Sequence, residues 1–426
     1  MVVFFLVFVL LIALSAPIAF AMLLCSLGFL YFTGTPLLIL PERIASGLNS
    51  YPLLAMPLFI LAARIMNTAG ITKRIFDLCL ALVGHTRAGL AHVNVVASMI
   101  FSGISGSAMA DVAGLGAVEV KAMIDEGYDP AYTAAVTAAS CTIGPVIPPS
   151  MIMILIGVMM EESIGRLFAG GFIPGVLMGV SLIVFISIQA RLGKSRFPAV
   201  RRQKATRAEL KKSLREGFLP ILAPVIILGT ILTGVATPTE AGIIAVVYAT
   251  ALGFLYKELN HRNIFEVLKD GAVQTGIIMF IVAAAQIFSW IITTQRVAVV
   301  AYAFITQFVT APWVILLLIN VFLLLIGCFI EGLAAIMITV PVLLPVVQQL
   351  GVSPVHFGVF LCINILLGLL TPPLGIAVYI SADVAKTNPM DVFRQATPFL
   401  IPLLITLGLV TYIPELVTFL PNLIFR

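Results

Sequence analysis

Residues 144–150 read GPVIPPS, a glycine, three prolines and a serine inside the otherwise apolar segment TAASCTIGPVIPPSMIMILIGVMM. Each proline lacks a backbone N–H and clashes with the turn before it, so a regular helix cannot run through this stretch. The sequence therefore predicts a helix that is interrupted at this point. The reason for the interruption depends on where the segment lies.

The composition is that of a membrane protein. Of the 426 residues 61% are hydrophobic and 10% are charged, against about 25% charged residues in soluble domains, and the mean hydropathy is +1.15. Short alternating segments typical of a β-barrel are absent. Runs near the roughly 20 residues that a spanning helix needs recur at residues 2–31, 51–69, 171–190, 218–236, 239–256, 272–292, 312–330 and 398–420. We expect a polytopic α-helical protein surrounded by membrane lipid, with residues 2–31 as a first span and no cleaved signal peptide.

Five cysteines lie in apolar segments without metal-ligand spacing, and we expect them to be buried free thiols: Cys25, Cys79, Cys141, Cys328 and Cys362. No GxGD, HExxH or Walker A motif is present, and no serine is paired with a histidine in a span. We therefore do not expect an enzyme, and an ion gradient is the expected energy source unless another subunit hydrolyses ATP.

Basic residues gather in one loop. Residues 191–216 hold ten Lys or Arg and two Glu, a net charge of +8, whereas the whole chain carries +5. By the positive-inside rule this loop is cytoplasmic, and a topogenic role fits it better than nucleic-acid binding. Counting spans onward places residues 256–271 inside and the region around Arg296 outside.

The loop separates two halves that contain a repeat. A shift of 224 residues aligns identical residues in both halves: Gly103 with Gly327, Ala110 with Ala334, Val118 with Val342, Gly127 with Gly351, Pro130 with Pro354, Gly144 with Gly368, Pro148 and Pro149 with Pro372 and Pro373, Ile152 with Ile376, and Ile156 with Ile380. Apolar matches are common in membrane proteins, but matched glycines and prolines place backbone irregularities at the same points of both halves.

The stretch that matches GPVIPPS is GLLTPPLG, residues 368–375. A proline kink that only shapes packing would explain one such site. Matched interruptions in two halves instead indicate the discontinuous helices of a secondary transporter, because irregular backbone at membrane depth must be buried in protein or line a wet cavity. Such a break exposes carbonyls, which can hold a cation, and amides, which can hold an anion.

A second irregular segment precedes each break. These segments are FSGISGSAMADVAGLG, residues 101–116, and IGCFIEGLAAIMITVPVLLP, residues 326–345. A re-entrant hairpin fits each better than a complete span, with tips near Ser105 and Glu331. Basic residues before the first hairpin, at 64–87, and a single one before the second, at 293–312, favour opposite orientations. The expected fold class is all-α and polytopic, with inverted repeats, two re-entrant hairpins and two discontinuous helices.

The paired Pro-Pro breaks, the SGSAMAD stretch at 105–111, TPTEAG at 237–242 and the basic central loop resemble the large, DctM-type membrane subunit of tripartite ATP-independent periplasmic (TRAP) transporters. The resemblance covers essentially the whole chain. It implies a sodium-driven, elevator-type importer of organic anions, such as C4-dicarboxylates or sialic acid, in the bacterial inner membrane. It also implies two partners, a small four-helix membrane subunit, expected as a separate chain, and a periplasmic substrate-binding protein.

The resemblance implies a division into scaffold and transport domains. The scaffold would comprise residues 1–70 and 217–292. The transport domain would comprise 71–190, with a hairpin at about 93–126 and a broken helix at about 131–160, and 293–426, with a hairpin at about 312–350 and a broken helix at about 355–385; residues 191–216 are the cytoplasmic loop.

Residue by residue, the resemblance implies two Na+ sites built mainly from carbonyls and hydroxyls, which hard cations prefer. The first would use Ser102, Gly103, Ser105, Gly144, Ile147 and Pro148, and the second Gly327, Gly332, Thr371, Pro372 and Gly375. The substrate carboxylate would lie between the tips, with Ser105, Ser107 and Ser150 as donors. Glu331 would balance a cation or accept from substrate hydroxyls.

Three further charged residues lie in or near apolar segments. Asp111 is either a sodium ligand or the cap of the returning helix. Glu240 is expected to lie at a helix N-terminus, where an acidic side chain is favoured. Arg64 is expected to snorkel to the cytoplasmic interface rather than attract an anion. A stand-alone sodium- or proton-coupled anion permease with the same hairpins remains the alternative function, and uptake without the other subunits would distinguish it.

Overall fold

The structure, a computed structural model, describes residues 1–192, 202–309 and 311–425, without the side chains of Ser102, Ile104, Ser105, His261 and Arg262. These residues form helices joined by loops, with no strand among them. Eight helical segments of the described chain are long and apolar enough to cross a membrane: Tyr51–Thr68, Ile164–Arg191, Arg207–Leu232, Pro238–Leu255, Asn263–Thr294, Pro312–Phe329, Gly332–Gln349 and Pro389–Tyr412. The prediction of an all-α polytopic protein is confirmed.

The N-terminal part is α1 (Val2–Ala13), α2 (Ile18–Phe32), α3 (Ile39–Leu48) and α4 (Ala55–Thr68), which a short 3₁₀ turn precedes. The predicted single span over residues 2–31 is wrong. Ser15 has a positive φ of 62°, and Pro17 stands just before α2, so the chain turns between two short helices. The helices pack on each other, with the rings of Phe4 and Phe29 5.7 Å apart.

The first half of the repeat contains α5 (Ile71–Val83), then α6 (Gly89–Ser105), α7 (Ala108–Ala113) and α8 (Leu115–Asp125). The last three form the predicted hairpin, because α7 and α8 return along α6. The broken helix follows as α9 (Pro130–Ser140) and α10 (Met151–Met160), with a 3₁₀ turn and irregular backbone between them. The long α11 (Ile164–Arg191) closes this half.

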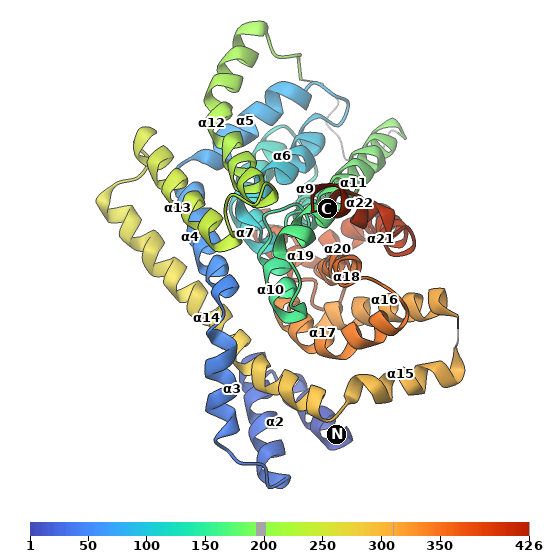
Figure 1. Ribbon diagram of the computed structural model, residues 1–426. Helices are drawn as coiled ribbons and strands as arrows, with labels where there is room; N and C mark the ends of the chain where they lie inside the picture. The colour runs from blue at the N-terminus through green and yellow to red at the C-terminus, as the bar shows by residue number, and fades with distance from the viewer. Residues whose placement is uncertain (193–201, 310, 426) are drawn as a thin grey trace.

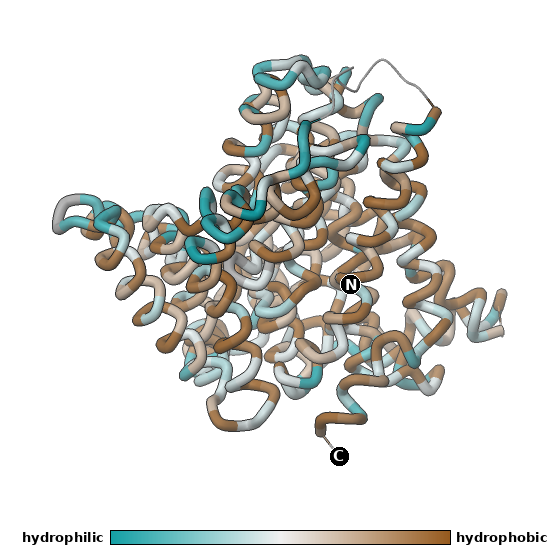
Figure 2. The backbone as a smooth tube through the Cα atoms, turned by 90° about the horizontal axis from the view of Figure 1, so that it is seen from above, coloured by the Kyte–Doolittle hydropathy of each residue, from teal (hydrophilic) through white to brown (hydrophobic). Residues whose placement is uncertain are grey.

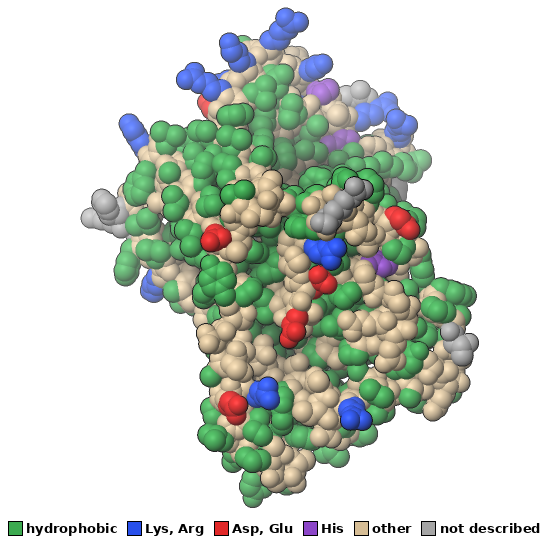
Figure 3. Space-filling model, in the orientation of Figure 1, with side chains coloured by type: hydrophobic (Ala, Val, Ile, Leu, Met, Phe, Trp, Pro, Cys, Tyr) green, Lys and Arg blue, Asp and Glu red, His purple; other side chains and the backbone are tan. Residues whose placement is uncertain are grey.

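The central segment consists of α12 (Arg207–Leu232), α13 (Pro238–Leu255), α14 (His261–Thr294) and α15 (Val297–Phe308). The predicted cytoplasmic loop therefore becomes helical from Arg207, while residues 193–201 lie outside the described part. Lys and Arg side chains gather at the top of the molecule, over α12 and α5 (Figures 1 and 3). Hydrophilic residues are concentrated at helix ends and connections (Figure 2).

The second half repeats the arrangement. Its hairpin is α16 (Pro312–Phe329) and α17 (Gly332–Gln349), and its broken helix is α18 (Pro354–Gly368) and α19 (Ile376–Val384). The chain ends with α20 (Pro389–Ala396), α21 (Leu400–Tyr412) and α22 (Glu415–Ile424). The predicted run at 398–420 is therefore interrupted, because Ile413 is not helical and Pro414 precedes α22.

The two broken helices form the centre of the molecule. Nearly every residue of α9 and α18 is buried, as expected for helices that are apolar on all sides. The halves interlock, because α10 packs on α17 and α18 while α19 packs on α7 and α9. Helices α4, α13 and α14 pack together on one side of this centre (Figure 1).

Candidate functional site

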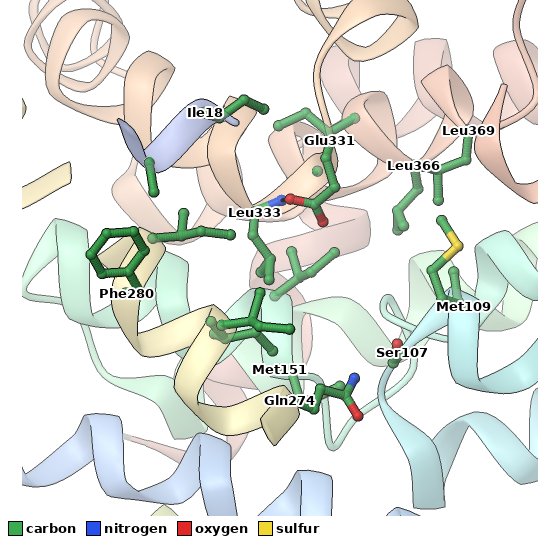
Figure 4. Close-up of a pocket in the computed structure, with 18 of the residues that line it drawn as sticks. Ile18, Ser107, Met109, Met151, Gln274, Phe280, Glu331, Leu333, Leu366 and Leu369 are labelled. Atoms are coloured by element: carbon green, nitrogen blue, oxygen red, sulfur yellow. Dashed lines mark hydrogen bonds between the residues drawn. The ribbon is translucent and has the colours of Figure 1, made fainter. Parts of the chain in front are cut away.

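A cavity of about 530 Å³ lies where the two hairpin tips meet. Residues 106–109 and 331–333 contribute the tips, and Met151 and Ile152 begin α10. Residues of α2 and α14 also line the cavity, and they are apolar apart from Gln274. Figure 4 shows Glu331 on one side of this central cavity and Ser107, Met151 and Gln274 on the other. The predicted place of the substrate, between the tips, is therefore a real space of the size of a small molecule.

The first tip touches the first break directly. The chain turns between Ser105 and Ala108, and Gly106 has a positive φ of 57°. The Met151 N–H donates to the Gly106 carbonyl at 3.4 Å. A Cβ on Gly106 would come within 2.7 Å of the Pro149 carbonyl oxygen, so both the turn and the close approach require glycine here.

The second tip touches the second break in the same way. The Leu374 N–H donates to the Cys328 carbonyl at 3.3 Å. Gly327 on α16 and Gly368 at the end of α18 are in backbone contact, because a Cβ on Gly368 would overlap the Gly327 backbone. The structure thus brings together the predicted segments 327–332 and 370–375.

Both return helices are capped at equivalent positions. Ser107 is the N-cap of α7, where its Oγ accepts from the Ala110 N–H at 3.4 Å. Glu331 is the N-cap of α17, where one carboxylate oxygen accepts from the N–H groups of Leu333 at 3.2 Å and Ala334 at 3.4 Å. The two caps are 224 positions apart and both line the central cavity. A structural role is therefore established for Glu331 beside its predicted contact with substrate or cation.

The breaks engage their own side-chain hydroxyls. Ser150 is fully buried and caps α10 by accepting from the Met153 N–H at 3.1 Å, and its hydroxyl donates to the Pro145 carbonyl. It is not among the residues that line the central cavity, so its role as a substrate donor stays a prediction. The Thr371 hydroxyl donates to the Leu367 carbonyl at 2.9 Å, which leaves its oxygen lone pairs open to a cation.

We call each contact between a hairpin tip and a break a crossing. The remaining predicted ion ligands lie at these two crossings. Gly103 stands one turn before the first tip, where a Cβ would lie 3.4 Å from the Pro148 carbonyl oxygen. The Ile147 side chain is buried, so only its carbonyl could serve an ion. The side chains of Ser102 and Ser105 lie outside the described part. No group of three or more His, Cys, Asp or Glu within residues 1–192, 202–309 and 311–425 could hold a metal, so an ion here would need carbonyls and hydroxyls.

Five further predicted ligands belong to the same regions. Gly144 and Pro148 belong to the first crossing, and Gly332, Pro372 and Gly375 belong to the second. Gly375 has a positive φ of 36° and begins α19. The Pro148-Pro149 and Pro372-Pro373 bonds are both cis. The structure assembles each predicted set of segments, whereas the binding of sodium to them stays a prediction.

Of the two roles left open for Asp111, the helix cap is excluded. Ser107 is the cap, and Asp111 lies a turn further along α7, 1% exposed, beside Ser98 and within electrostatic reach of the equally buried Glu119. The role of Asp111 as a sodium ligand stays a prediction. Glu119 was not singled out from the sequence, because its burial depends on how α8 packs against α5, α6 and α9.

The structure shows the partners of two other charged residues. Glu240 closes a capping box at the start of α13, accepting from the Thr237 N–H at 2.7 Å, so its predicted structural role is confirmed. Arg64 does more than extend toward an interface, since it contacts Gln274 and Asp270 of α14. All five cysteines are buried and free, as expected.

Sequence reasoning missed the α14 wall. Gln274, Ile277 and Phe280 of α14 line the central cavity. A signal existed for one of them, because Gln274 is the only amide between residues 272 and 285 of an apolar run, and polar residues inside spans tend to be functional. The apolar residues carried no such signal.

Over residues 5–416 the sequence matches the family described as "Tripartite ATP-independent periplasmic transporter, DctM component". The chain belongs to the DctM family. It is therefore a subunit of a transporter in the bacterial inner membrane, and the resemblance inferred from the sequence is confirmed.

Relatives of the DctM-family chain include permeases for different substrates. It is 40% identical over 410 residues to the sialic acid TRAP transporter large permease protein SiaM of Vibrio cholerae, covering 96% of this chain and 95% of that one. It is 37% identical over 373 residues to the C4-dicarboxylate TRAP transporter large permease protein DctM of Pseudomonas aeruginosa, covering 87% and 86%. It is 36% identical over 408 residues to the 2,3-diketo-L-gulonate TRAP transporter large permease protein YiaN of Escherichia coli, covering 95% of each.

The fold also has a solved counterpart. The YdaH transporter of Alcanivorax borkumensis, described as having an unusual topology, superposes with a TM-score of 0.64 at 15% identity and covers 88% of both chains. At this identity the likeness concerns the fold alone. The family, together with relatives that are transporter permeases, fits the expectation that the chain is not an enzyme.

Proposed function

We propose that this DctM-family protein imports an organic carboxylate across the inner membrane, coupled to sodium, by an elevator movement of the hairpins and broken helices. The observation that carries the proposal is the central cavity, whose walls come from two different parts of the chain. Residues 106–109, 151–152, 331–333 and 365–369 belong to the expected transport domain, whereas 17–20 and 274–281 belong to the expected scaffold. A substrate held at the tips would therefore lie at the boundary along which the two parts would slide.

The chemistry of the tips supports a small polar anion. Each tip ends in the N-terminus of a return helix, where the helix dipole favours negative charge. At the second tip the Glu331 carboxylate already accepts from the first N–H groups, so the substrate carboxylate would bind nearer the first tip. Ser107 adds a hydroxyl at the first tip. The two crossings of tip and break supply the carbonyls that sodium prefers, and two cations there would offset the charge of Glu331 and of an incoming carboxylate.

The substrate class rests on the relatives, whose names refer to sialic acid, a C4-dicarboxylate and a diketo-gulonate. All three are small carboxylates. The small four-helix membrane subunit and the periplasmic binding protein are proposed as partners because the family is a component of a tripartite transporter.

The test is uptake into proteoliposomes that contain this chain and its small subunit. Sialic acid and succinate serve as probes, under an inward sodium gradient, with and without the periplasmic binding protein. Uptake that needs both sodium and the binding protein is expected. Uptake by this chain alone, or uptake driven by protons without sodium, would contradict the proposal and favour a stand-alone permease.

A further inference from the structure

Two further cavities extend the central one toward one end of the molecule. The connecting cavity, about 420 Å³, shares Met109, Met151 and Gln274 with the central cavity. The outer cavity, about 240 Å³, shares Arg64 and Asn67 with the connecting cavity and reaches the start of α14. The three cavities therefore form a series that runs from the hairpin tips along α4 and α14.

The outer cavity lies at the end expected to face the cytoplasm. The described lining there includes Asn263, Glu266 and Asp270 of α14. Residues 256–271 are expected on the same side as the basic loop, because the two spans α12 and α13 follow that loop. The series is thus a route by which a substrate in the central cavity could leave toward the cytoplasm.

Arg64 is the one basic side chain among the described residues that line the three cavities. It stands where the connecting and outer cavities meet, on α4. Its Nε donates to Gln274 Oε1 at 3.0 Å, and Gln274 also lines the central cavity. An anion that passes Gln274 therefore meets the Arg64 guanidinium next.

The contacts that hold Arg64 in place do not use all the N–H donors of its guanidinium. A guanidinium has five N–H donors in a planar fork that fits a carboxylate. Besides Gln274, the Arg64 side chain binds Asp270, with 3.2 Å between Nη1 and Oδ2. The Arg64 side chain is 37% exposed and the Asp270 side chain 62%. Because an exposed ion pair contributes little stability, another carboxylate could displace Asp270 readily.

We propose that Arg64 is a second anion-binding point, which takes the substrate carboxylate from the hairpin tips on its way to the cytoplasm, with Asp270 as the competing group that later displaces it. The inference rests on the proposed carboxylate import. It differs from it in assigning a binding role to a residue of the expected scaffold, which stays in place while the tips move.

Local attraction of anions can be tested without transport. Asn67→Cys places a thiol beside Arg64 in both cavities that Arg64 lines, and the five native cysteines are buried. Labelling rates are compared for methanethiosulfonates that carry a sulfonate or a trimethylammonium group. Adding Arg64→Gln is expected to slow the anionic reagent about fivefold relative to the cationic one, since one unit charge at short range in water is worth about that factor. An unchanged ratio of the two rates overturns the proposal.

The matched control for labelling is Arg43→Gln in the same Asn67→Cys background. Arg43 stacks over Trp290, with its Cζ 5.5 Å from the ring centroid, and lines none of the three cavities. The Arg43→Gln variant removes the same charge from the same expected scaffold, and it should leave the ratio of the two labelling rates unchanged.

Transport by the complete complex gives the second readout. Arg64→Gln is expected to lower the maximal rate of sialic acid or succinate uptake about tenfold, the factor expected for one charge-assisted hydrogen bond, and Arg64→Lys less. Asp270→Asn should hold the anion longer, with a lower maximal rate and a lower half-saturating concentration. Wild-type rates in Arg64→Gln overturn the anion point and leave the proposed function intact. If the wild-type complex imports neither probe, the proposed function fails, and the labelling ratio still decides the role of Arg64.

Discussion

In the first half of the repeat, the Met151 N–H donates to the Gly106 carbonyl at 3.4 Å, and in the second half the Leu374 N–H donates to the Cys328 carbonyl at 3.3 Å. Both hydrogen bonds join a hairpin to a broken helix, and they connect positions that nearly match in the two halves of the repeat. Both return helices are capped at matched positions, by Ser107 and Glu331.

The side chains around the two crossings differ strongly. The first half buries polar groups where the second half has apolar ones: Asp111 against Ala335, Glu119 against Leu343, Ser98 against Phe322 and Asn94 against Leu318. The second half has its own smaller network, in which Asn364 Nδ2 donates to Asn320 Oδ1 and Asn320 Nδ2 donates to Thr411 Oγ1 at 3.1 Å. The comparison teaches that the repeat preserves a backbone geometry, whereas each half fills it with different chemistry.

The largest effect is expected where the two backbones meet. Gly368→Ala should cost about 3 kcal/mol, because the added methyl group would overlap the Gly327 backbone and the crossing would have to open. The measurement is the thermal unfolding midpoint of the purified chain in detergent. Gly276→Ala on α14 is the control, since nothing lies within 4 Å of its Cβ. A midpoint equal to wild type would show that the second crossing is looser than the structure describes.

The next effect concerns the buried carboxylate of the first half. Glu119→Leu installs the residue type of position 343 and should raise stability by about 2 kcal/mol, because a buried carboxylate is costly without partners and neither Glu119 oxygen has a hydrogen-bond partner in the described structure. The same unfolding assay measures it, and the reciprocal Leu343→Glu should destabilise. Lower stability of Glu119→Leu would mean that an unseen ligand or proton holds the carboxylate, and uptake by the stabilised variant would tell whether transport needs it.

A third variant separates the capping role of Glu331 from its charge. Glu331→Gln keeps an acceptor oxygen for the N-terminus of α17, so the fold should persist, while the loss of charge should lower uptake about tenfold. The proteoliposome assay measures it. Glu240→Gln is the matched control, because Glu240 also serves a helix N-terminus but lies outside the central cavity. Equal uptake by both variants would leave Glu331 with the capping role alone.

The smallest effect is expected at the two proposed sodium sites. Thr371 in the second break occupies the position of Ile147 in the first. Thr371→Val removes one hydroxyl without changing the shape and should raise the half-saturating sodium concentration about threefold, a fraction of one ligand's contribution. Ile147→Val is expected to change nothing, because only the carbonyl of that residue could reach an ion. A sodium dependence that is identical in Thr371→Val and wild type would remove Thr371 from the ion site.

Several features were predictable because they depend on local chemistry. The breaks at 144–150 and 369–375 follow from prolines that cannot continue a helix, and the tips at 105–107 and 330–331 follow from small or polar residues inside apolar segments. The single span over residues 2–31 was mispredicted because apolarity alone does not show that Ser15 adopts a left-handed backbone.

The site was only partly predictable. Matched positions led to the tips and breaks, but the cap at Ser107 rather than Asp111 depends on backbone angles at the start of α7. The α14 wall and the pairing of Arg64 with Asp270 join residues about 200 positions apart, and no local pattern records such a pair.

The sequence by itself determined the membrane environment, the repeat, the two breaks and the family, because proline chemistry, hydropathy and spacing act within a few turns of chain. The tertiary structure alone decided which side chains face the central cavity, which carboxylates are buried, and that Arg64 lines the two cavities between the tips and the start of α14. The physical reason is that apolar helices pack in many registers, and only the close contacts of glycine backbones and helix ends select one of them.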